Sequence, residues 1–155
     1  MVFSSFWFGS SVVNPISLSA TASDGNLGGS NVGRINAGEA TPLFTTANRP
    51  LGSNLVICQL DFGSAQLVAG FRAVNTKQAG SSDGVSMRIE QSSDDSSWTT
   101  FGSTWNISPG DQEHTETQTP TAVTKRYWRL IANQNFDGVA SIGEMELYAS
   151  TGQMP

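Results

Sequence analysis

The sequence predicts a single all-β domain, built as an antiparallel β-sandwich or jelly roll with an N-terminal aromatic arm. Only 14% of the 155 residues are charged, whereas exposed amphipathic helices need abundant Glu, Lys and Arg. Residues 85–91 and 142–149 alternate with a period of two, as half-buried strands do, and no stretch sustains a helical apolar period. Many short strands without crossover helices are typical of sandwiches.

We expect three segments along the chain: an arm at 1–15, the sandwich at 16–150 and a C-terminal tail at 151–155. The arm gathers aromatic side chains that would form an unusually apolar patch in water, namely Phe3, Phe6, Trp7 and Phe8. These side chains are expected either to pack on the chain's own sandwich as an added strand or to dock into a neighbouring subunit. In a docking arm, aromatic anchors would supply most of the binding energy.

The long segment 24–52 is rich in glycine and has little periodicity, so we expect an ordered loop of the kind that carries binding sites. The predicted strands that follow cover residues 54–62, 67–75, 85–91, 126–132 and 142–149, with a short turn at 63–66. Residues 112–124 are polar and contain alternating threonines. They predict an edge strand, because edges tolerate polar side chains.

Two tryptophans are suited to fill the space between two sheets. Trp98 follows a polar turn and Trp128 lies within a predicted strand, so both are expected in the core. Cys58 lies in an apolar run and is expected to be a buried, inert thiol. Because it is the single cysteine, it excludes an internal disulfide.

Three patches occur in a characteristic order. The first is QLDFG at 59–63 with LVAGF at 67–71, the second is RIEQSSDDSSW at 88–98, and the third joins RYWRL at 126–130 with IGEMELY at 142–148. Together they resemble the discoidin, or coagulation factor 5/8 type C, family, whose fold also occurs in galactose-binding carbohydrate modules. The resemblance implies a galactose-binding-like sandwich over most of residues 17–150.

The family often holds a calcium ion through an Asp-Gly-Asn turn and a glutamate of the closing strand. The matching residues here are Asn36 and Glu144. Because an amide at Asn36 replaces a carboxylate, the site would lose an anionic oxygen that Ca²⁺ prefers. We therefore expect no metal and no cofactor.

Composition and motifs disfavour catalysis and nucleic-acid binding. A nucleophilic Ser or Cys needs a positioned base, and the single histidine, His114, lies in a polar run where a surface position is the simpler interpretation. A net charge of -5 with scattered Lys and Arg opposes phosphate binding. No apolar run reaches the roughly 20 residues of a membrane span. We expect a protein that is not an enzyme, has no nucleic-acid partner and does not insert into a membrane.

Two functions fit these features, because fold alone does not determine function. The first is a bacteriophage virion protein, a capsid-decorating or tail component that docks to neighbouring virion or scaffold proteins and could form a homo-oligomer. A family-like module starting at Met1, an aromatic arm and the absence of Lys or Arg before Arg34 motivate it. Without the charged start of a secretory signal, such a protein would be made in the host cytoplasm and located in the virion.

The alternative is a carbohydrate-binding module that recognises host or surface glycans. A sugar site needs an aromatic face for the ring and planar polar groups for the hydroxyls, placed on loops at one end of the sandwich. The candidate residues are Asn48, Arg49, Asn75, Lys77, Trp105, Asn106, Asn133, Asn135 and Phe136. For Trp105, packing beneath the turn at 108–112 is as plausible as exposure.

Overall fold

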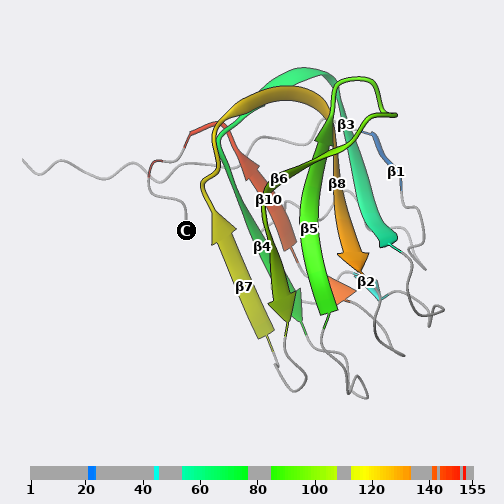
Figure 1. Ribbon diagram of the computed structural model, residues 1–155, viewed down its shortest axis with the longest axis vertical. Helices are drawn as coiled ribbons and strands as arrows, with labels where there is room; N and C mark the ends of the chain where they lie inside the picture. The colour runs from blue at the N-terminus through cyan, green and yellow to red at the C-terminus, as the bar shows by residue number, and fades with distance from the viewer. Residues whose placement is uncertain are drawn as a thin grey trace, which may run out of the picture.

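The computed structural model describes residues 21–23, 44–45, 54–76, 85–107, 113–133, 141–142, 144–150 and 152. Within these residues, every regular element is a β-strand (Figure 1). The ten strands are β1 (Thr21–Ser23), β2 (Phe44–Thr45), β3 (Asn54–Val68), β4 (Gly70–Thr76), β5 (Val85–Ser92), β6 (Thr99–Ile107), β7 (Glu113–Gln118), β8 (Val123–Asn133), β9 (Ser141–Ile142) and β10 (Glu144–Tyr148). None of the described residues forms a helix that could span a membrane.

The strands form two main sheets that face each other, which confirms the predicted antiparallel sandwich (Figure 1). One sheet has the order β1-β3-β8-β5-β6 and the other the order β10-β4-β7, while β2 and β9 form a separate pair. All the recorded pairings are antiparallel. The polar strand β7 lies at the edge of the three-stranded sheet, as its threonines predicted.

Strand β8 is central to the larger sheet because it pairs with β3 on one side and β5 on the other. Its residues alternate as the period-two pattern requires. Trp128 and Leu130 are fully buried between the sheets, whereas Arg129 lies on the opposite face and is half-buried. The prediction of a core position for Trp128 is confirmed.

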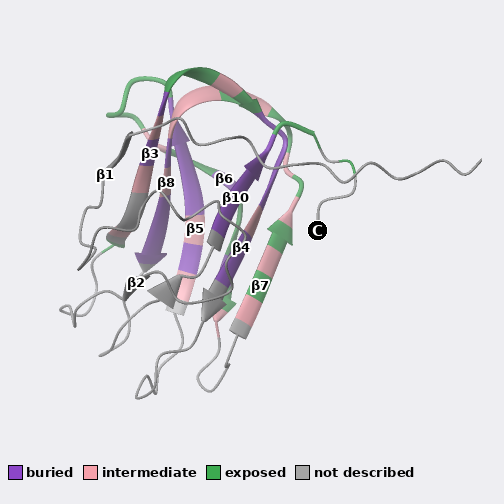
Figure 2. Ribbon diagram, turned by 180° about the vertical axis from the view of Figure 1, so that it is seen from behind, coloured by how far each residue is buried: buried purple, intermediate pink, exposed green. Residues whose placement is uncertain are grey.

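Buried segments of both main sheets line the space between them (Figure 2), and aromatic rings join the two sheets there. Phe101 on β6 meets Trp128 on β8 edge to face, with ring centroids 5.0 Å apart. Phe71 on β4 contacts both Phe101 and Trp105, at centroid distances of 6.2 and 5.6 Å. Tilted and edge-on contacts of this kind add to the free energy gained by burying apolar area. The core therefore fixes how β4 sits against β6 and β8.

Three details differ from the expectations. The predicted turn at 63–66 lies within the long strand β3, where the pairing with β8 shifts register between Asp61 and Gln66. Trp98 was wrongly placed in the core: it is only half-buried, and its ring stacks against the Arg129 guanidinium. Glu90 is buried although the period-two pattern of residues 85–91 puts it on the face opposite Met87 and Ile89. Arginine partners explain that burial, because paired charges can leave water at lower cost.

Several predictions lie outside the described residues. They are the aromatic arm at 1–15 with Phe3, Phe6, Trp7 and Phe8, the loop as a whole between 24 and 52, the calcium-loop counterpart Asn36, and the side chains of Cys58 and Glu144. The boundaries of the arm and of the tail at 151–155 stay predictions.

Candidate functional site

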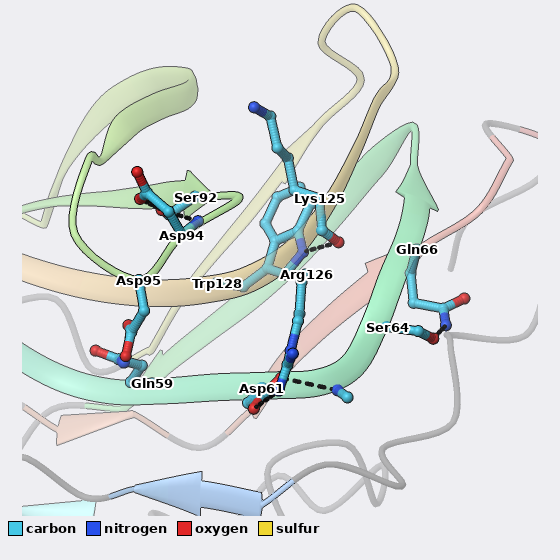
Figure 3. A network of polar contacts seen from close by, with 11 residues as sticks. Gln59, Asp61, Ser64, Gln66, Ser92, Asp94, Asp95, Lys125, Arg126 and Trp128 are labelled. Atoms are coloured by element: carbon cyan, nitrogen blue, oxygen red, sulfur yellow. Dashed lines mark hydrogen bonds and ion pairs between the residues drawn. The ribbon is translucent and has the colours of Figure 1, made fainter.

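The first family-like patch marks the place where β3 and β8 bend together at one end of the sandwich (Figures 1 and 3). Asp61 accepts two hydrogen bonds from Arg126, at 2.6 and 2.8 Å, and a third from the Gly63 backbone N–H at 2.8 Å. The Arg126 hydrogen bond is the largest influence that lowers the pKa of the Asp61 carboxyl. Gly63 has a φ of 72°, a conformation that glycine adopts without steric cost. This motif stabilises a bend in the backbone.

The second patch forms the turn between β5 and β6 (Figure 3). The Asp94 carboxylate accepts hydrogen bonds from the backbone N–H groups of Ser97 and Ser96 and from the Ser92 hydroxyl. These bonds, with Ser97 the largest, hold the pKa of Asp94 well below its usual range. Asp95 has a φ of 60° and accepts a 2.6 Å hydrogen bond from Gln59 on β3. The patch therefore stabilises a turn and supplies no free acid–base pair.

A charged network covers the outer face of the five-stranded sheet. Glu90 accepts hydrogen bonds from Arg88 at 2.7 Å and from Arg129 at 2.8 Å, and the Arg129 guanidinium lies over the Trp98 ring, 4.1 Å from its centroid. Burial raises the pKa of Glu90, but the hydrogen bonds to Arg129 and Arg88 outweigh it and leave the pKa lowered. On the smaller sheet Glu146 is likewise paired with Arg72 at 3.1 Å. These carboxylates are neutralised by arginine and are mostly buried.

An open hollow of about 480 Å³ lies where the edge strands of the two sheets meet. It is lined by residues of β6, of β7 and of the segment after β7, namely Gly102, Ser103, Thr104, Glu116, Gln118, Thr119 and Pro120. The hollow is a cleft between sheets, because β6 and β7 are edge strands of different sheets. It is the candidate functional site in the described part of the chain.

The side-chain amide of Gln118 on β7 pairs with the backbone of Ser103 on β6. Its Oε1 accepts a 2.7 Å hydrogen bond from the Ser103 N–H, and its Nε2 donates to the Ser103 carbonyl at 3.0 Å. The same Nε2 donates to Glu116 Oε1 at 2.8 Å. Both hydrogens of the amide are therefore used, and the Glu116 carboxylate is fixed in place.

Close approach at this link requires glycine at position 102. Gly102 has a φ of 79°, and a Cβ atom there would overlap Gln118 Oε1 and lie 3.1 Å from Pro120 Cγ. An L-residue would be strained in this conformation even without the overlap. Gly102 thus lets β7 reach β6, and it lines the hollow.

The hollow offers groups that suit a polyhydroxylated ligand. Within the described residues, the hydroxyls of Ser103, Thr104 and Thr119 have no hydrogen-bond partner in the protein and are exposed. The second oxygen of Glu116, Oε2, lies 3.3 Å from His114 Nε2, and the Glu116 side chain is 22% exposed. Hydroxyls both donate and accept, while a carboxylate accepts only.

The structure corrects one glycan candidate and leaves most of the others undescribed. Trp105 is 5% exposed and packs on Phe71, so its ring has no face available for stacking on a sugar. Asn106, its neighbour on β6, is exposed. Asn75 and Asn133 are described only in the backbone, at the ends of β4 and β8. The remaining candidates lie outside the described residues: Asn48, Arg49, Lys77, Asn135 and Phe136.

The residues of the hollow were missed in the sequence because the edge strand was interpreted from its threonines. Thr115 and Thr117 are exposed, whereas the alternate residues Glu116 and Gln118 are partly buried. Two polar residues on the less exposed face of an edge strand are a detectable signal, since that face normally meets the core. His114 belongs to this face and contacts Glu116.

The described residues contain no group of three His, Cys, Asp or Glu side chains arranged to hold a metal ion. That statement does not cover Asn36 and Glu144, which match the family's calcium-binding residues, because their side chains are not described.

No protein-family model matches the chain, and no curated protein matches it. Solved structures do. A chitosan-binding module from a chitosanase/glucanase of Paenibacillus sp. IK-5 is 24% identical, with a TM-score of 0.63 over 86% of this chain and 98% of that one. A CBM32 module from a family 31 glycoside hydrolase of Clostridium perfringens is 12% identical, with a TM-score of 0.62 over 87% and 96%.

A pectin-binding carbohydrate-binding module is 20% identical, with a TM-score of 0.59 over 91% of this chain and 96% of that one. These similarities establish the fold. The chain has the β-sandwich fold of these modules, which is the fold that the resemblance to the discoidin family implied.

Proposed function

We propose that this protein is a non-catalytic module that binds glycans. The observation that carries the proposal is the extent of the structural match: the sandwich spans 95–98% of separate carbohydrate-binding modules. The named ligands of those modules include chitosan, pectin and a GalNAc-β-1,3-galactose disaccharide. Their common chemistry is a saccharide, so the proposal extends to the class of ligand and not to one sugar.

Two further matches support a binding role over a catalytic one. This chain matches only 25% of a Ruminococcus gnavus GH29 fucosidase chain and 28% of another GH29 chain. The shared portion is thus one module of a larger protein. In the described part of this chain, moreover, Asp61, Glu90 and Glu146 are each paired with arginine. An acid that protonates a leaving group must be able to titrate near working pH, which arginine pairing opposes.

The hollow between β6 and β7 supports the proposal. It presents three hydroxyls that have no partner among the described residues and one fixed carboxylate, and saccharide recognition relies on polar groups of this kind. The loop candidates Asn48, Arg49, Lys77, Asn135 and Phe136 remain a second predicted location.

The interpretation as a bacteriophage virion protein gains no support from the similar structures named above. Docking through the aromatic arm stays a prediction, because residues 1–15 are not described. Removing residues 1–11 tests it: an arm that docks to a partner leaves the isolated domain folded with nearly unchanged melting, whereas unfolding of the truncated protein would refute docking.

A glycan array tests the proposed function. The intact chain is applied to immobilised neutral, acidic and amino saccharides, and unfolded protein serves as the control for nonspecific adhesion. We expect saturable binding by the folded protein to at least one saccharide class. A folded chain that binds none of them above the unfolded control would overturn the proposal.

A further inference from the structure

Three described carboxylates outside the hollow are matched by a fixed cation. Asp61 faces Arg126, Glu90 faces Arg88 and Arg129, and Glu146 faces Arg72. In each pair the arginine cancels the negative charge and supplies directed donors. These carboxylates have little charge left to offer a ligand.

Glu116 differs from them. Its Oε1 accepts a hydrogen bond from the neutral amide of Gln118, and its Oε2 lies near His114, which is cationic only when protonated. No arginine or lysine contacts it within the described residues. With its side chain 22% exposed, Glu116 brings a negative charge to the wall of the hollow.

The carboxylate is also held in position before any ligand arrives. Gln118 is tied to both the N–H and the carbonyl of Ser103, so the amide that fixes Glu116 is itself anchored to the opposite sheet. Binding then requires little ordering of the acceptor, which favours affinity. Ser103, Thr104 and Thr119 line the same hollow as Glu116.

We propose that the hollow binds a cationic amino sugar, with its ammonium group on the Glu116 carboxylate and its hydroxyls on those of Ser103, Thr104 and Thr119. The inference rests on the proposed glycan-binding function and names the saccharide class that this site selects. The ammonium donates to an oxygen of Glu116, a charge-assisted hydrogen bond of the strong kind. The net charge of -5 draws the cation toward the protein from a distance.

Isothermal titration of the intact chain tests the inference with two matched probes. Oligosaccharides of glucosamine carry ammonium groups, and their fully N-acetylated counterparts have the same backbone without the charge. At a pH where the amines are protonated, we expect the wild type to bind the glucosamine form about tenfold more tightly, as one hydrogen bond to a charged group allows.

Two variants separate the site from the overall charge. Glu116→Gln keeps the shape and removes the charge, so it is expected to lose most of the tenfold preference. Asp95→Asn is the matched control: it removes one negative charge from the exposed turn, at a φ of 60° that asparagine tolerates. It is expected to keep the preference.

The outcomes are distinct. If both variants lose the tenfold preference equally, or if Glu116→Gln leaves that preference unchanged, the inference is overturned and glycan binding still stands. The same holds if the wild type binds both probes equally. If neither probe binds and the glycan array is also negative, the proposed function fails and the inference fails with it. Circular dichroism of each variant establishes that it is folded.

Discussion

Replacing Gly102 with alanine tests how the two edges of the sandwich are joined. The variant has two separate costs. A residue other than glycine at a φ of 79° costs about 1 kcal/mol from the backbone conformation alone. The new Cβ also overlaps Gln118 Oε1, so the amide must move and give up its two hydrogen bonds to Ser103.

Each of those hydrogen bonds contributes about 1 kcal/mol. We therefore expect Gly102→Ala to lower the free energy of unfolding by about 3 kcal/mol in total. Gly63 provides a matched control, because its φ is 72° but a Cβ there would meet nothing within 4 Å. Gly63→Ala should cost only the conformational part, about 1 kcal/mol.

Urea unfolding of both variants and of Gln118→Ala measures these values. The double variant Gly102→Ala with Gln118→Ala should be less destabilised than the sum of the two single variants, since both remove the same hydrogen bonds. Equal destabilisation by Gly102→Ala and Gly63→Ala would refute the argument, because it would mean that the contact with Gln118 contributes nothing.

Four further predictions concern the core and the charged pairs. Trp128→Ala should cost about 3–5 kcal/mol by chemical denaturation, the usual loss for a fully buried aromatic. Trp98→Ala should cost about 1–2 kcal/mol, because the ring is half-buried and mainly stacks on Arg129; equal losses for the two would contradict their different burial. Asp61 has a lowered folded pKa, so its pairing stabilises the protein above the unfolded pKa of 3.8 and is lost as pH falls below it. The stability difference between wild type and Asp61→Asn should narrow from neutral pH to acid, and a difference independent of pH would contradict the pairing. Thermal unfolding should show one cooperative transition, because both main sheets share one core, and two separated calorimetric peaks would disprove it.

The fold was predictable because half-buried strands leave a local alternation of apolar and polar residues in the sequence. Alternation in β5 placed Met87 and Ile89 inward, and both are fully buried. The family-like patches at Asp61 and Asp94 are conformational motifs, a bend and a turn, so they carry the fold and say little about a ligand.

The site was less predictable because it depends on contacts between distant strands. Gln118 is hydrogen-bonded to Ser103 of the other sheet and to Glu116 beside it, a relation that no local period reveals. The burial of Trp98 and Trp105 was difficult to predict for the same reason. Trp98 stacks with Arg129 on the outer face, and Trp105 packs on Phe71 in the core. Their neighbours in space, which the sequence does not give, decide which tryptophan is accessible.

Titration of isotopically labelled protein with saccharides, followed by the backbone amide signals, tests glycan binding most directly. The probes are the glucosamine oligosaccharides, their N-acetylated counterparts and a galactose-containing disaccharide. We predict saturable shifts with the glucosamine form, centred on Ser103, Thr104 and Glu116 in the hollow. Saturable shifts confined to other residues would retain the glycan-binding function and refute the hollow as its site. A folded protein whose signals do not move with any of these sugars or with any saccharide on the array would contradict the account.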